Sequence, residues 1–187
     1  LSFTTLRKML EGISEKQKDS QIIVATHNSM IASRLNLNNV LWITESGVKS
    51  LSGVDEKVAN FFVRADDNAF LQLLLSKKVF LVEGATEFLL LPHFYWQLTG
   101  NTVEDDGISV ISCNGISYMK YLEIAAKTDK KIAVITDNDK KQDRIDSAKE
   151  HNRENDLQHI YMAESTDDWT WEICMYNANK AALDTMI

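Results

Sequence analysis

The second part of the chain alternates between short apolar runs and longer segments whose apolar residues recur at helical spacing. The short runs predict buried strands and the longer segments predict helices. Such alternation is typical of α/β domains, in which right-handed crossover helices join parallel strands. Pro92 falls inside the first of these helices, where it predicts a kink or a break. Strands are predicted at 79–82, 108–112, 132–136 and 157–162, and helices at 86–98, 117–127, 142–151 and 169–182.

The pattern before residue 77 is less regular. It predicts a helix over the first 14 residues, strands at 21–25 and 39–44, and one long helix from Asp55 to Leu75. We place a domain boundary near residues 75–78, which divides the chain into segments 1–76 and 77–187. The chain begins without Met and stops within a helical pattern. We therefore expect it to be a piece of a longer protein and the second segment to be truncated at its end.

Composition adds limits to this picture. The chain has 187 residues, of which 44% are hydrophobic and 25% charged, as in ordinary folded domains. No apolar run is long enough for a membrane span, and no signal peptide opens the chain. Cys113 and Cys174 do not have the paired spacing of a zinc site, and two such cysteines fit a reducing compartment, so we expect a cytoplasmic location. Because no apolar run is long enough for a membrane span, we expect no membrane partner. The net charge of −7 argues against a protein that simply coats DNA, but not against a nuclease whose metals neutralise its acids.

Two of the predicted strands end in acidic residues. Glu83 follows the strand at 79–82, and Glu87 comes one helical turn later. Asp137 and Asp139 follow the strand at 132–136 and point the same way if the chain there is extended. Ligands of open α/β sheets bind beyond the carboxyl ends of the strands. Because carboxylates are the ligands that Mg²⁺ and Mn²⁺ prefer, the pattern predicts a metal site with these four acids.

Each acidic element also has an ordinary structural explanation. Glu83 is a favourable charge near a helix start, and Glu87 can lie on a solvated helix face. The segment Asp137-Asn138-Asp139 can form a turn, because Asp and Asn side chains favour turns. The order of the two elements, both between a strand and a helix, favours the metal site over these alternatives.

The acidic segments resemble those of TOPRIM domains, which occur in topoisomerases, primases and certain nucleases. The resemblance rests on residues 81–87, Leu-Val-Glu-Gly-Ala-Thr-Glu, and on residues 135–139, Ile-Thr-Asp-Asn-Asp. Residues 113–115, Cys-Asn-Gly, are similar to the glycine turn of that family. The presence of a second acid, Glu87, resembles the pattern of the nuclease branch that is named after the overcoming-lysogenisation-defect (OLD) proteins. Thr-Trp-Glu at 170–172 resembles a Thr-Leu-Glu element of that branch, which implies Glu172 as a further metal-site residue; a plain helix-start Glu is the alternative.

The segment 21–29, Gln-Ile-Ile-Val-Ala-Thr-His-Asn-Ser, resembles the last strand and switch histidine of an ABC-type ATPase. The resemblance implies that His27 senses the γ-phosphate of ATP; a capping or surface role is the alternative. OLD proteins join such an ATPase to a following TOPRIM nuclease, which is the order of segments 1–76 and 77–187. No glycine-rich phosphate loop occurs in the chain, so we expect ATP hydrolysis only in a longer protein.

The resemblance implies a Rossmann-like TOPRIM fold with a parallel sheet. It also implies an endonuclease that cleaves DNA with two Mg²⁺ or Mn²⁺ ions and that acts in antiphage defence. Glu83, Glu87, Asp137 and Asp139 would be catalytic ligands, with Lys140 as the assisting lysine. Lys140, Lys141 and Arg144 could also contact phosphates. The resemblance further implies a homodimer or larger homo-oligomer and an accessory defence protein. Two alternatives stay open: a topoisomerase- or primase-type TOPRIM domain, and a non-catalytic regulatory or dimerisation domain of an ATPase.

Overall fold

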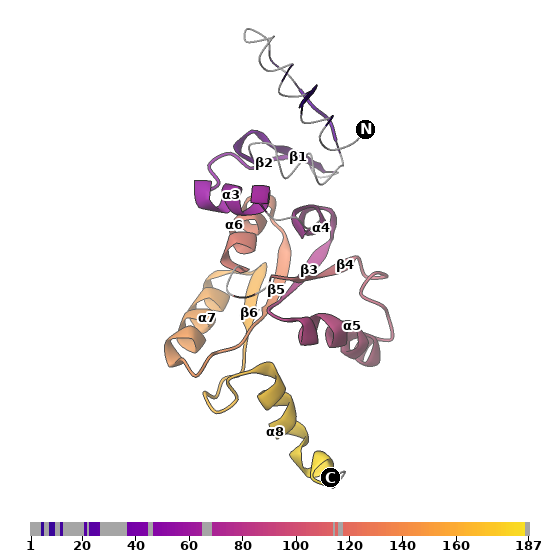
Figure 1. Cartoon of the computed structure of the whole chain (residues 1–187), viewed down its shortest axis with the longest axis vertical. Helices are drawn as coiled ribbons and strands as arrows, with labels where there is room; N and C mark the ends of the chain where they lie inside the picture. The colour runs from indigo at the N-terminus through magenta and orange to yellow at the C-terminus, as the bar shows by residue number, and fades with distance from the viewer. Residues whose placement is uncertain are drawn as a thin grey trace.

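The structure is a computed structural model of the chain, and it describes residues 37–44, 47–64, 69–113, 115 and 118–185 (Figure 1). Before residue 37 it describes only residues 5, 8, 9, 12, 21 and 23–26. The elements are η1 (Leu37–Asn39), β1 (Leu41–Thr44), β2 (Gly47–Ser50), α3 (Glu56–Arg64), α4 (Ala69–Leu75), β3 (Lys78–Val82), α5 (Ala85–Thr99), β4 (Ile108–Ser112), α6 (Tyr118–Thr128), β5 (Lys131–Ile135), α7 (Gln142–Glu154), β6 (Gln158–Tyr161) and α8 (Trp171–Leu183).

The centre of the fold is a four-stranded parallel sheet with the order β4-β3-β5-β6. The chain moves from β3 outward to β4, then crosses back over β3 to β5. The loops that leave β3 and β5 therefore run to opposite sides, which makes this pair of strands the switch point of the sheet. Val82 pairs with Ile135, the last residue of β5. The residues that follow these two strands consequently leave the sheet side by side.

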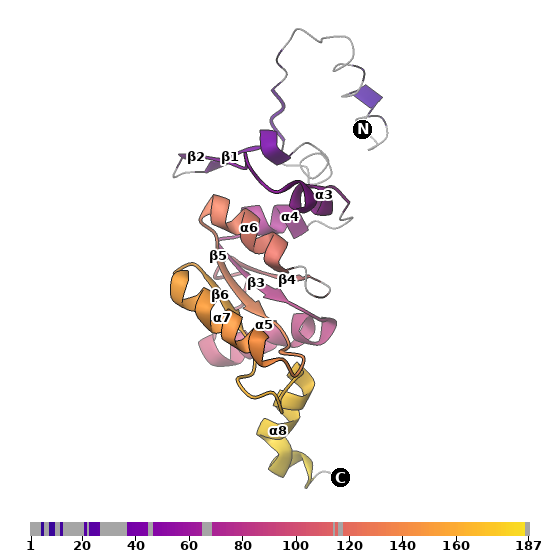
Figure 2. The same ribbon diagram turned by 90° about the vertical axis from the view of Figure 1, so that its left-hand side faces the viewer.

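The two faces of the sheet are covered differently. In Figures 1 and 2, α7 and α5 lie on opposite faces. On the α7 side, Ile132 and Val134 of β5 are buried in the main hydrophobic core, together with Ala148 of α7. On the other side, α5 covers β3 through a contact between the rings of Phe80 and Tyr95. That helix leaves part of the β5–β6 surface open.

The segment 37–75 shares its core with the sheet. Rings from α3, α4 and α6 pack against each other, with Phe62 and Tyr121 at a centroid distance of 5.0 Å and Phe62 and Phe70 at 5.4 Å. Phe62, Phe70 and Tyr121 are all almost fully buried. The β1–β2 hairpin and α8 lie at opposite ends of the molecule (Figure 1). The hydrophobic core is therefore continuous across the predicted boundary at residues 75–78, and the division into two domains stays a prediction.

The strands and helices predicted after residue 77 are all present, within a few residues of their predicted ends. Three details before that point and inside α5 are wrong. The long helix from Asp55 to Leu75 is instead two helices, α3 and α4. Residues 21 and 23–25 are not in a strand, since no other strand in the described ranges pairs with them. Helix α5 runs through Pro92, so the predicted break is absent, and a kink there stays a prediction.

No helix among the described residues is both long enough and apolar enough to cross a membrane.

Candidate functional site

Glu83 and the end of β5 are joined directly. The pairing of Val82 with Ile135 places Glu83 beside Thr136, the first residue after β5. The Thr136 hydroxyl donates a hydrogen bond to Glu83 Oε2. The backbone N–H of Asp137 donates to the same oxygen, with an N···O distance of 3.1 Å. The carboxylate of Glu83 is thus oriented across the switch point toward the Asp137–Asp139 segment.

Glu87 is the buried acid of the site. It lies in the first turn of α5 and is 5% exposed. Gly84 precedes the helix, and a Cβ atom there would lie 2.8 Å from Glu87 Oε2, so the missing side chain makes room for this carboxylate. Among the residues that the structure describes, none donates a hydrogen bond to Glu87. Neither of its oxygens is among the fully buried unpaired side-chain atoms of the described residues, so the carboxylate reaches solvent and is accessible to a cation.

Asn138 to Lys141 form a turn, closed by a hydrogen bond from the Lys141 N–H to the Asn138 carbonyl at 2.9 Å, so the chain leaves the predicted extended course at Asp139. Asp139 and Lys140 both have left-handed backbone angles, with φ of 52° and 60°. The physical reason lies in Asn138, which is fully buried and donates from Nδ2 to the carbonyls of Ala163 and Ser165 at 3.0 and 2.9 Å. Its side-chain oxygen accepts from the N–H of Lys140 at 2.9 Å. Left-handed non-glycine residues persist only where the surroundings enforce them, and they cluster at functional sites.

Asp137 and Asp139 are held by different helices. Asp137 Oδ1 accepts from the N–H of Trp171, the first residue of α8, at 2.8 Å. Asp139 Oδ2 forms an ion pair with Arg144 of α7. Glu83, Asp137 and Asp139 therefore each have one carboxylate oxygen bound by the protein. Their other oxygens accept no hydrogen bond from any described residue.

Electrostatics show that the acids are neighbours. Burial, together with the negative charges of Glu83, Glu87 and Glu172, raises the pKa of Asp137 to about 6. The hydrogen bond from the Trp171 N–H opposes this rise. Burial, followed by the charge of Glu83, also raises the pKa of the Cys113 thiol to about 11. Negative charge has thus accumulated at the carboxyl end of β3 and β5.

The acids do not already form a closed set of ligands. Over the described ranges, no group of three or more His, Cys, Asp or Glu side chains is arranged to hold a metal ion. Glu172 is exposed in the first turn of α8. Lys140 Nζ lies 3.7 Å from the centre of the Trp169 ring. His27 lies outside the described residues, so its predicted role in ATP sensing stays a prediction.

The donor chemistry of these residues suits a divalent cation, although the described side chains are not arranged around one point. The unbound oxygens of Glu83, Asp137 and Asp139 and the buried carboxylate of Glu87 are hard donors, which Mg²⁺ and Mn²⁺ prefer. The space that Gly84 leaves for Glu87 keeps this acid beside the strand ends. A cation would also offset the charge repulsion that raises the pKa of Asp137.

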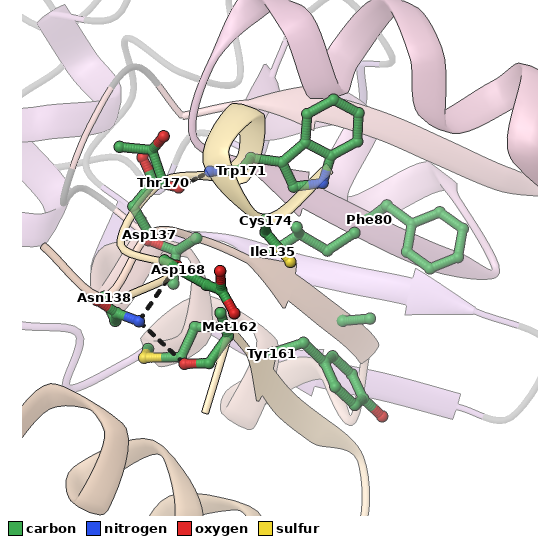
Figure 3. A pocket seen from close by; sticks show the side chains of 13 residues that line it. Phe80, Ile135, Asp137, Asn138, Tyr161, Met162, Asp168, Thr170, Trp171 and Cys174 are labelled. Carbon is green, nitrogen blue, oxygen red and sulfur yellow. Dashed lines mark hydrogen bonds between the residues drawn. The ribbon is translucent and has the colours of Figure 1, made fainter. Parts of the chain in front are cut away.

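A cavity of about 510 Å³ lies next to Asp137 on the open face of the sheet (Figure 3). Apolar side chains from β3, β5, β6 and α8 form most of its wall, and its polar lining consists of Thr136, Asp137, Asn138, Asp168 and Thr170. The apolar part of the wall consists of Phe80, Ala133, Ile135, Tyr161, Met162, Ala163, Trp171 and Cys174.

Reasoning from the sequence missed two residues that organise the site and gave a third a different role. Thr136 was assigned only to a strand and Asn138 only to a turn, and Arg144 was expected to contact phosphate. In the structure both terminal nitrogens of Arg144 are used inside the site, by Asp139 and Thr136. A polar residue placed between a buried strand and an acid was the available signal for Thr136.

Residues 74–139 match the family model described as "Overcoming lysogenization defect protein-like, TOPRIM domain". The match includes Glu83, Glu87, Asp137 and Asp139 and ends at the last of them. No curated protein matches the chain.

Proposed function

Because residues 74–139 belong to the family of OLD-like TOPRIM domains, we propose that the chain is the nuclease part of a metal-dependent DNA endonuclease. TOPRIM domains typically bind divalent metals and act on nucleic acids, and the four-stranded parallel sheet with flanking helices agrees with that fold. Cleavage of DNA is the finer part of the proposal. It rests on Glu87, the second acid after β3, because a second acid at this position resembles the pattern of the nuclease branch.

The observation that carries the proposal is the state of the carboxylate oxygens. In a purely structural cluster, acids are expected to use their oxygens in hydrogen bonds and ion pairs within the protein. Here three acids are each fixed through one oxygen and leave the other without a donor among the described residues. Glu87 is buried with neither oxygen bound in that same part of the chain. Such an arrangement suits a cation that enters from the open side.

In the proposed mechanism, Glu83, Glu87, Asp137 and Asp139 hold one or two Mg²⁺ or Mn²⁺ ions. Bound metal supplies Lewis-acid activation of a water and of the phosphodiester. The chain's own contribution is orientation, because Asp137 is fixed by the N-terminus of α8 and Glu83 by the end of β5. Lys140 is the proposed assisting lysine, and its release from the Trp169 ring would be needed for contact with a phosphate.

The wider role rests on the family alone. We propose that the chain works within a longer protein in which an ABC-type ATPase domain contains His27, and that this protein forms homodimers or larger homo-oligomers. Antiphage defence, together with an accessory protein, is part of the same proposal.

A nicking assay on supercoiled plasmid DNA tests the proposed activity. With Mg²⁺ or Mn²⁺ the chain should convert plasmid to the open-circle form, and chelation of the metal should stop the reaction. Asp137→Ala should remove the activity, whereas Asp146→Ala, an exposed acid on α7, should keep it. A folded Asp137→Ala variant that nicks at the wild-type rate would instead support the non-catalytic domain.

A further inference from the structure

Arg144, in the first turn of α7, is connected to both acidic strand ends. Its Nη1 atom forms the ion pair with Asp139 Oδ2, and its Nη2 atom donates to Thr136 Oγ at 3.2 Å. Thr136 in turn donates to Glu83 Oε2. One guanidinium thus links an acid that follows β3 with an acid that follows β5, although the two residues are far apart in sequence.

The direction of these hydrogen bonds follows from their chemistry. A threonine hydroxyl has a single hydrogen and rotates to suit its neighbours. Since the guanidinium only donates, Thr136 accepts from Arg144 and keeps its hydrogen for Glu83. Thr136 is 4% exposed and the Arg144 side chain is 14% exposed, so water competes little for these bonds. Arg144 therefore determines which way the Thr136 hydroxyl points.

The contacts of Arg144 leave the predicted metal-facing oxygens available. The guanidinium occupies Oδ2 of Asp139, and the relay through Thr136 occupies Oε2 of Glu83. Oδ1 of Asp139 and Oε1 of Glu83 accept no hydrogen bond from a described residue. The planar fork of arginine allows one side chain to reach two acceptors in fixed directions, which a lysine cannot do.

We propose that Arg144 is a positioning residue of the metal site. It holds Asp139 directly and Glu83 through Thr136, so that one oxygen of each acid faces the cation. This inference rests on the proposed function, because it assumes that the acids bind a divalent metal. The expected contact between Arg144 and phosphate stays a separate prediction, because the two hydrogen bonds use only two of the five N–H donors of the guanidinium.

The test is the affinity of the whole chain for Mn²⁺, measured by titration calorimetry without DNA. Arg144→Gln should weaken binding by about 10- to 100-fold, the usual effect of losing a group that orients metal ligands. Arg144→Lys should also bind more weakly than wild type, although the charge is kept. Arg153→Gln is the matched control, because it removes the same charge from an exposed position in the last turn of the same helix. It should bind Mn²⁺ as the wild type does.

A second pair of variants tests the relay without changing charge. Thr136→Val removes the hydroxyl and should weaken Mn²⁺ binding, whereas Thr136→Ser should restore it. Circular dichroism of the metal-free variants shows whether each is folded. Wild-type affinity or tighter binding in Arg144→Gln would overturn the inference while the proposed function survives. Equal affinities for the Val and Ser variants would overturn the link to Glu83. If the wild-type chain bound no Mn²⁺, this inference and the proposed function would both be wrong.

Discussion

The two acidic elements meet at one edge of the sheet but are built in opposite ways. After β3, the chain enters α5 at once, and Glu87 is buried beside Gly84 without a donor from any described residue. After β5, a strained turn is fastened by Asn138, and both Asp137 and Asp139 are bound by other helices. The first element provides a carboxylate that no described residue binds, whereas the second provides carboxylates that are already oriented.

The difference shows how negative charge can be gathered without unfolding the site. The turn after β5 uses a cation of the protein, Arg144, and a helix N-terminus to offset its charges. The corner after β3 has no such compensation for Glu87 among the described residues. We therefore expect removal of an acid to have different effects on activity and on stability in the two elements.

The largest expected effect is on cleavage. Asp137→Ala, Asp139→Ala and Glu83→Ala should each lower metal-dependent nicking by more than about 100-fold, because direct ligands matter at least as much as the groups that orient them. Glu87→Ala should leave a weak activity that is better with Mn²⁺, since water can replace one ligand in the metal shell. Initial rates on supercoiled plasmid measure this. An equal loss in all four variants would remove the distinction between the two elements.

A smaller effect, of opposite sign in the two elements, is expected on the stability of the metal-free chain near pH 7. Glu87→Gln should raise the melting temperature, because it removes a charge that repels Asp137. Each kcal/mol added to the free energy of unfolding corresponds to a rise of about 2–4 °C in a chain of this size. Asp139→Asn should lower it, because the variant loses the ion pair with Arg144. Thermal melts in the presence of a chelator give both values. A shift in the same direction for both variants would contradict the comparison.

The smallest expected effect is a change in pH dependence. The pKa of Asp137 is raised from 3.8 to about 6 by burial, so the folded chain binds a proton here more strongly than the unfolded chain does. The contribution of Asp137 to stability is thus largest below pH 4 and is lost as the pH rises through about 6. Asp137→Asn, which keeps an acceptor for the Trp171 N–H, should lack this loss. Denaturant titrations of the metal-free proteins from pH 4 to 8 give the free energy of unfolding at each pH. If the assignment is wrong, this free energy will change with pH in the same way for wild type and Asp137→Asn.

Much of the fold after residue 77 could be predicted from local pattern. The strands of the sheet are short apolar runs, and the helices between them have clear apolar periodicity. The end of β3 is marked by Glu83 and the end of β5 by Thr136 and Asp137. The parallel direction of the strands follows from the alternation itself. The four acids could be selected because strand ends in such a sheet share one edge, and the family match covers all four.

Errors arose where neighbours in space overruled the local pattern. The helical pattern from Asp55 to Leu75 is divided between α3 and α4. Phe62 of α3 packs against Tyr121 of α6 and also against Phe70 of α4. The turn after β5 was expected to be extended, but buried Asn138 finds its partners in residues 163–165. Neither interaction is visible in a window of neighbouring residues.

The sequence alone therefore determined the alternating α/β fold, the acidic residue types and their positions at strand ends, because these depend on periodicity and on the chemistry of single side chains. Only the tertiary structure decided that β5 lies next to β3, that α8 donates to Asp137, and that Arg144 joins Asp139 to Thr136 and Glu83. The physical reason is that strand order and the packing of crossover helices set the distances between residues far apart in the chain. Hydrogen bonds between such residues form only after that packing exists.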